Sequence, residues 1–189
     1  IRFLIAECDY SLTAMTALYY SKIFDVEEKI DISPLFETEK GLINGHNVIG
    51  TLLKNNYYRE YVKKRKKLTI QTGFSDAGRY LGQSAAVLYI ENLQRKIAHI
   101  LSEEKLKDVK LLIFNTHGES IGRGGHPVSL SDRLNYVNCQ YTRKKLKDWK
   151  IELIQEMSFQ GGDGYQYFMN KDLAFSCLCR ITEFCLNEQ

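Results

Sequence analysis

The sequence predicts an α/β fold in which about five strand–helix units build a parallel sheet. Short apolar runs typical of buried strands alternate with longer segments whose apolar residues recur at helical spacing. The strands end at intervals of roughly 30 to 45 residues, which leaves room for a helical crossover between parallel neighbours. Each strand also ends in a polar or ionisable residue, in chain order Glu7, Glu37, Asp76, His117 and Gln160.

The individual elements follow from these patterns. Strands are expected at residues 2–6, 30–36, 68–72, 109–114 and 149–159. Helices are expected at 12–24, 44–66, 82–104 and 171–186, the second with a possible break near Asn55 and Asn56. The stretch 128–147 is less regular and is expected to hold a helix and connections.

Length and composition indicate part of one globular domain. The chain has 189 residues, 44% of them apolar, and no apolar run approaches the length of a membrane span. It starts inside a strand-like run and shows no signal-peptide pattern. We therefore expect residues 1–189 to form part of a single domain that is truncated at both ends.

The net charge of +3 is modest, and its densest basic run is Lys63 to Lys67. Such a run could contact nucleic acid or a membrane surface. The preferred interpretation is the solvated end of a helix, where cations complement the helix dipole. Neither nucleic acid nor a membrane is expected as a partner.

The cysteines favour neither a disulfide framework nor a zinc site. They number five and include no C-x-x-C pair. Cys177, Cys179 and Cys185 fall in an apolar helical pattern and are expected to be small core residues. This cysteine usage fits a reducing cytoplasm.

The carboxyl ends of parallel strands share one edge, where loops build ligand sites. Glu37 and Asp76 should therefore lie near His117 and the glycine-rich loop around Arg123. Glycines, an arginine and a histidine suit phosphate or another oxyanion, although a plain surface turn is an equal possibility. The carboxylates could instead cap the helices that follow them, the interpretation preferred for Glu7.

Three sequence blocks, in this order, resemble phosphoenolpyruvate carboxylase. They are SPLFET at 33–38, GFSDAGRYLG at 73–82 and HGESIGRGG at 117–125, similar to the family's PLFET, GYSDSxKDAG and HGRGGSIGRGG. The resemblance implies a segment of a (β/α)8 barrel of the TIM type. Such a barrel needs about 250 residues, so five units form an incomplete one.

The resemblance also implies roles for individual residues. Glu37 and Asp76 match the carboxylates that bind Mg2+ or Mn2+, which prefer oxygen ligands. The residues matched to catalysis are His117, Arg123 and Arg79, the last standing where the family has lysine. The residues expected to bind substrate are Ser120, Gly122, Gly124, Gly125 and Gln160.

The implied reaction is carboxylation of phosphoenolpyruvate by bicarbonate to give oxaloacetate and phosphate. By resemblance the enzyme would be a cytoplasmic homo-oligomer, in this family a tetramer, and the isolated fragment would be inactive. Glu119 and Glu156 stand near positions where the family has arginine. They motivate an alternative, a catalytically impaired relative that keeps an anion and metal site for a binding or regulatory role.

Overall fold

The computed structural model describes residues 1–106, 108–116, 137–157 and 170–187. The five strands are β1 (Arg2–Ile5), β2 (Asp31–Phe36), β3 (Lys67–Thr72), β4 (Lys110–Asn115) and β5 (Leu153–Met157). The helices in these ranges are α1 (Ser11–Ile23), α2 (Glu39–Lys54), α3 (Asn56–Arg65), α4 (Phe74–Leu81), α5 (Gln83–Glu103), α7 (Gln140–Trp149) and α9 (Lys171–Asn187).

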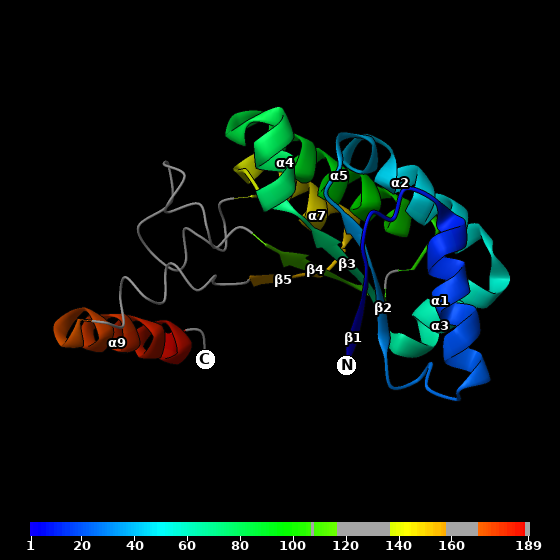
Figure 1. The fold of residues 1–189 in the computed structure, drawn as a ribbon, viewed down its shortest axis with the longest axis horizontal. Helices are drawn as coiled ribbons and strands as arrows, with labels where there is room; N and C mark the ends of the chain where they lie inside the picture. Colours follow the sequence, from blue (N-terminus) through cyan, green and yellow to red (C-terminus); the bar gives the residue numbers. More distant parts are fainter. Residues whose placement is uncertain (107, 117–136, 158–169, 188–189) are drawn as a thin grey trace.

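The strands form one parallel sheet in the order β1-β2-β3-β4-β5 (Figure 1). Strand order therefore equals chain order, with one crossover between each pair of neighbours. This confirms the predicted α/β class, with parallel strands joined by helices.

The hydrophobic core lies between one face of the sheet and the helices. Alternate strand residues such as Ile70 and Ile113 are fully buried against α2 and α5, which contribute Leu52 and Ile97. In Figure 1, α2, α4, α5 and α7 lie on the same side of the sheet, and α5 packs on α2, α4 and α7. This packing leaves the opposite strand residues on a face that these helices do not cover.

The predicted break in the second helix is confirmed at Asn55, whose side chain caps α3 by accepting from the N–H groups of Tyr57 and Tyr58. The predicted start of β5 at Trp149 was wrong. Trp149 ends α7 and stacks on His99 of α5, with ring centroids 4.9 Å apart. The short helix α4 was not among the predicted helices.

The basic run forms the end of a helix, as predicted. Lys63, Lys64 and Arg65 occupy the last turn of α3, and Lys66 is its left-handed C-cap. Arg65 and Lys67 both pair with Asp31 at the start of β2, with Arg65 Nε 3.0 Å and Lys67 Nζ 2.8 Å from the carboxylate. Part of this positive charge is thus neutralised within the fold.

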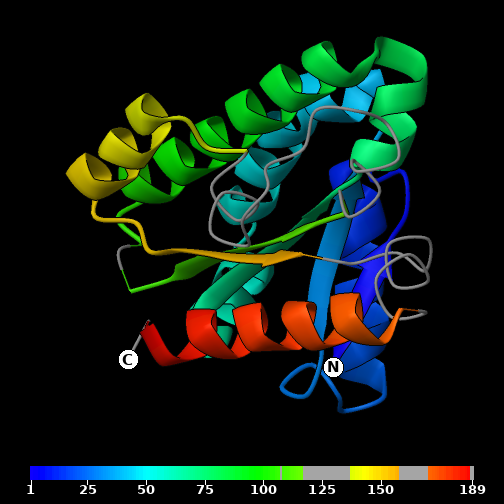
Figure 2. The same cartoon turned by 90° about the vertical axis from the view of Figure 1, so that its left-hand side faces the viewer.

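Helix α9 contradicts the prediction that its cysteines belong to the core. None of its residues is buried; Cys179 and Cys185 are exposed and Cys177 is half-buried. Figure 2 shows α9 on the side of the sheet opposite α5 and α7. The helix was predicted correctly from its periodicity. Such periodicity indicates that one face of the helix is apolar, but it does not indicate whether another element covers that face. Among the described helices, none is long and apolar enough to cross a membrane.

Candidate functional site

Glu37 directly follows β2, and the residues on either side of it are firmly held. Phe36 is fully buried and packs so closely on Gly45 of α2 that a Cβ there would lie 2.8 Å from the ring. Thr38 caps α2 by accepting a hydrogen bond from the N–H of Gly41 at 2.9 Å. Because Thr38 makes this cap, Glu37 is left available for another role.

Asp76 lies in the first turn of α4, where a negative charge is favoured by the helix dipole. Buried Phe74 and Ala77 anchor this helix on the core. The Asp76 carboxylate pairs with Arg79 one turn later, at 3.4 Å, and both side chains are largely open to solvent. The sequence predicts Asp76 at the end of a strand. The structure places it on a short helix instead.

The structure brings Glu37 and Asp76 together. Their carboxyl groups are in hydrogen-bonding contact. Burial raises the pKa of Glu37, and the neighbouring Asp76 carboxylate raises it further, while the N–H of Glu7 acts in the opposite direction. Two carboxylates this close repel each other unless a proton or a cation lies between them.

Gly73 makes room for this contact. A Cβ at Gly73 would lie 2.6 Å from Glu37 Cβ and 3.2 Å from Glu37 Oε2. The Gly73 N–H donates to the carbonyl of Phe36 at 3.0 Å, which continues the strand pairing to the residue before Glu37. A side chain at position 73 would therefore displace the Glu37 carboxylate, and this dependence was not recognised from the sequence.

The preferred role for Glu7, capping the following helix, was wrong. The N-cap of α1 is Tyr10, and no side chain caps that helix. Glu7 instead has a left-handed backbone, with φ 45°, and lies close enough to Glu37 to influence its pKa. The left-handed conformation is uncommon for a residue other than glycine.

The paired carboxylates fit a divalent cation. Mg2+ is often held by one or two carboxylates, with water and substrate completing its coordination. In the described part of the chain, no cluster of three or more acidic, histidine or cysteine side chains could hold a metal ion. Glu37 and Asp76 thus offer a two-carboxylate site of the kind that suits Mg2+ or Mn2+.

The other predicted site residues lie outside the described ranges. They are His117, Ser120, Gly122, Arg123, Gly124, Gly125 and Gln160. Thr116 is the described residue directly before His117. Its N–H donates to the Thr72 carbonyl at 3.1 Å, beside Gly73. The chain that leads to His117 therefore leaves the sheet next to the strand that precedes Asp76.

An unpredicted ion pair spans the face of the sheet opposite α2 and α5. Arg2 of β1 pairs with Glu156 of β5, and its guanidinium lies 4.7 Å from the centre of the Phe114 ring. The two strands are at opposite edges, about 19 Å apart in a flat sheet with ordinary strand spacing. The contact therefore requires the sheet to curve toward this face.

The same face carries buried polar atoms that lack a hydrogen-bond partner in the described structure. They are Arg2 Nε, Ser33 Oγ and Gln71 Oε1. Ser33 is fully buried and Gln71 is 6% exposed. Polar side chains inside the curve are expected to meet further polar groups or water.

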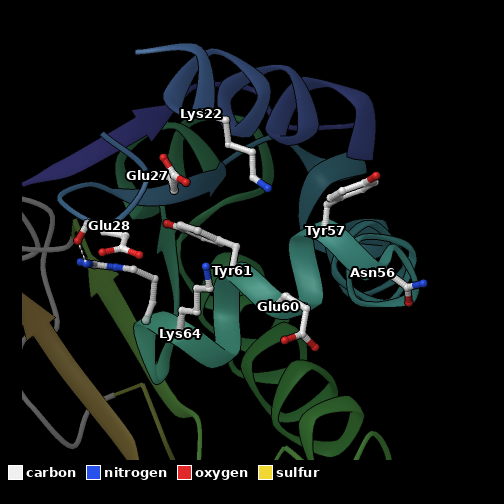
Figure 3. Close-up of a pocket in the computed structure, with 9 residues that line it drawn as sticks. Lys22, Glu27, Glu28, Asn56, Tyr57, Glu60, Tyr61 and Lys64 are labelled. Carbon is white, nitrogen blue, oxygen red and sulfur yellow. Dashed lines mark hydrogen bonds between the residues drawn. The ribbon is translucent and has the colours of Figure 1, made fainter. Parts of the chain in front are cut away.

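A separate hollow lies at the other end of the sheet, near the amino ends of β2 and β3. It has a volume of about 200 Å³, and residues of both charges line it (Figure 3). Lys22 lies 5.1 Å from the Tyr57 ring, and Arg65 donates to the carbonyl of Glu28. This hollow contains none of the predicted site residues.

Comparison with known proteins identifies the family. The family model for phosphoenolpyruvate carboxylase matches residues 11–131, well over half of the chain. The chain belongs to the phosphoenolpyruvate carboxylase family. The matched stretch includes the described pair Glu37 and Asp76.

Individual relatives agree with this assignment. The chain is 32% identical over 115 residues to a phosphoenolpyruvate carboxylase of Hahella chejuensis, covering 61% of this chain and 12% of that protein. It is 32% identical over 108 residues to phosphoenolpyruvate carboxylase 1 of Chlamydomonas reinhardtii, covering 57% and 11%. A relative from Tolumonas auensis is 34% identical over 96 residues, covering 51% and 10%. The chain thus spans only 10–12% of the length of these relatives.

Proposed function

We propose that this chain is a segment of a phosphoenolpyruvate carboxylase in which Glu37 and Asp76 bind Mg2+ or Mn2+. The observation that carries the proposal is the contact between these two carboxyl groups at the carboxyl end of the sheet. Burial and, after it, the neighbouring Asp76 carboxylate raise the pKa of Glu37, which supports a pair of carboxylates that repel each other when both are ionised. A divalent cation would relieve that repulsion and hold both groups in their charged form.

The reaction implied by the family name needs negative charge to be stabilised twice. Bicarbonate attacks the phosphorus of phosphoenolpyruvate, which gives carboxyphosphate and the enolate of pyruvate. Carbon dioxide released from carboxyphosphate, with loss of phosphate, then joins the enolate carbon to form oxaloacetate. Glu37 and Asp76 would hold a divalent cation, which would supply positive charge to balance the enolate and phosphate oxygens.

The remaining residues complete this proposal. Arg79 orients Asp76 through the 3.4 Å ion pair and adds positive charge beside the site. His117 and Arg123 act on the phosphate and carboxylation intermediates, and Ser120, Gly122, Gly124, Gly125 and Gln160 contact substrate. In the intact protein we propose a cytoplasmic homotetramer with phosphoenolpyruvate and bicarbonate as substrates.

We also propose that the five units belong to a (β/α)8 barrel. Arg2 pairs with Asp31, and Lys67 pairs with Lys110. Extending the observed offsets of the β2–β3 and β4–β5 pairings links Asp31 to Lys67 and Lys110 to Glu152. Arg2 instead contacts Glu156, four residues further along β5 and four strand steps away. An offset of about one residue per strand is the stagger of an eight-stranded barrel with shear eight. The register and the curvature together support the barrel.

One observation favours the alternative, a relative that binds ligand without turnover. Arg2 lies on the face of the sheet opposite α2 and α5, where Glu156 neutralises its guanidinium. Glu156 stands near a position at which the family has arginine. A substrate anion would meet a carboxylate there instead of a free cation. Binding of phosphoenolpyruvate without formation of oxaloacetate would select this alternative.

The metal site is tested by measuring Mn2+ affinity with electron paramagnetic resonance. Glu37→Gln and Asp76→Asn should each weaken Mn2+ binding by about tenfold or more, because each removes one of two charged ligands. Glu39→Gln, a nearby exposed carboxylate on α2, is the matched control and should leave the affinity unchanged. Equal affinity in all four proteins would reject the site.

A further inference from the structure

Four amide side chains, three of them buried and one half-buried, form a closed ring of hydrogen bonds. Asn115 Nδ2 donates to Gln155 Oε1 at 3.1 Å, and Gln155 Nε2 donates to Asn138 Oδ1. Asn138 Nδ2 donates to Gln94 Oε1 at 3.0 Å, and Gln94 Nε2 returns to Asn115 Oδ1 at 3.0 Å. Each amide therefore donates once and accepts once around the ring.

Three members of the ring are buried, and a buried polar group is costly when it lacks a hydrogen-bond partner. Asn115 is fully buried, and Gln94 and Asn138 are each 1% exposed. A buried amide that loses its partner bears the full cost of desolvation, whereas a fully paired network is rigid and specifies a single geometry. Loss of one member would thus leave its two neighbours each with an unmet donor or acceptor.

The members come from four separate parts of the chain. Asn115 ends β4, Gln155 lies in β5, Gln94 lies in the middle of α5, and Asn138 precedes α7. Thr72, the last residue of β3, joins the ring because its hydroxyl donates to Asn115 Oδ1 at 2.7 Å. One network therefore ties the carboxyl ends of β3 and β4 to the middle of β5.

These ties end next to the candidate metal site. Thr72 directly precedes Gly73, the residue that leaves room for the Glu37 carboxylate. Gly73 is also the N-cap of α4, which carries Asp76 in its first turn. The distance between Glu37 and Asp76 thus depends on where β3 ends. The ring, through the Thr72 hydroxyl, adds to the backbone pairing that holds this end against β4.

We propose that Gln94, Asn115, Asn138 and Gln155, together with Thr72, are positioning residues for the Glu37–Asp76 site. This rests on the proposed function insofar as that pair binds a divalent cation. The described side-chain hydrogen bonds of Asn138 and Gln94 run to other members of the ring and not to Glu37 or Asp76. A metal-affinity effect from either residue therefore reports positioning and not ligation.

The experiment uses Asn138→Leu, which breaks two bonds of the ring without touching either carboxylate. Gln155→Met, at a half-buried position, replaces it if the first variant does not fold. Ile49→Val, a fully buried change in α2, is the control for a general loss of stability. The Mn2+ dissociation constant is measured for each protein, and hydrogen exchange is followed at residues 72–73, 115–116 and 137–139 relative to α2.

The ring variants should bind Mn2+ about tenfold more weakly and exchange about tenfold faster at these strand ends, while Ile49→Val matches the unaltered protein. Unchanged Mn2+ affinity in a folded ring variant would overturn the proposal, whatever the exchange rates. If even the unaltered protein binds no Mn2+, the metal site fails. Faster exchange confined to the strand ends would then still support their positioning by the ring, and uniform exchange would overturn it.

Discussion

Gly73 shows how the candidate site depends on a single residue without a side chain. Glu37 and Asp76 could be predicted from the sequence because carboxylates that follow successive strands converge at one edge of the sheet. The role of Gly73 could not, because it depends on the 2.6 Å approach of Glu37 Cβ, a contact between different parts of the chain. The sequence marks only a glycine after a strand, which is common in turns.

Gly73→Ala should therefore damage both the fold and the site. The added Cβ must push Glu37 away, which we expect to cost about 1–3 kcal/mol of stability and to weaken Mn2+ binding. Gly50→Ala is the matched control: its Cβ would meet only Ile100 Cδ1 at 3.7 Å, an ordinary contact, inside helix α2. It should stabilise the protein by about 0.5–1 kcal/mol. The free energy of unfolding of both variants is measured in urea. An unchanged free energy of unfolding in Gly73→Ala would contradict the close approach of Glu37 to position 73.

His46 predicts how stability changes with acid. Burial and the nearby Lys96 lower the pKa of His46 in the folded protein. Below about pH 6.5 the unfolded chain then binds a proton that the folded chain binds less readily, so stability falls as the pH decreases. His46→Gln should remove the part of this acid-dependent loss of stability that is due to His46. The variant should gain stability relative to the unaltered protein between pH 7 and 5, by less than about 1 kcal/mol because the site is only partly buried. The free energy of unfolding of both proteins is measured between pH 7 and 5. The prediction is wrong if the two values change with pH in parallel.

At the scale of elements, the alternation of strands and helices was predictable, but the elements that depend on tertiary contacts were not. Trp149 suggested a strand by its aromatic character, yet it ends α7 because it stacks on His99 of α5. Helix α4 has only eight residues, too short for a periodic pattern, and is held by buried Phe74 and Ala77. The amide ring gave no local signal, because its members lie far apart in the sequence.

Helix α9 predicts a pattern of thiol reactivity. Its cysteines were expected in the core, but Cys179 and Cys185 are exposed, whereas Cys8 is fully buried and its burial raises its pKa to about 11. Brief alkylation of the native chain, mapped by mass spectrometry, should modify Cys179 and Cys185 and spare Cys8 until the chain is unfolded. Protection of the α9 cysteines in the native 189-residue chain would show that this helix is covered.

At the scale of the whole molecule, the curvature of the sheet links the fold to the proposed enzyme. The Arg2–Glu156 pair joins the two edge strands, and the Glu37–Asp76 pair lies beyond the carboxyl ends of β2 and β3. Because the chain spans only 10–12% of its relatives' length, we expect the 189 residues alone to be inactive. Oxaloacetate formation by this isolated chain would contradict the need for further barrel strands.

The most direct test is bicarbonate-dependent formation of oxaloacetate by the full-length protein in the presence of Mg2+. The oxaloacetate is detected by coupled reduction to malate. The proposed function predicts turnover that requires bicarbonate and Mg2+ and that falls by at least about a hundredfold in Glu37→Gln and Asp76→Asn, because each removes a ligand to the cation. Turnover no greater than that of a Glu37→Ala, Asp76→Ala double variant would contradict it.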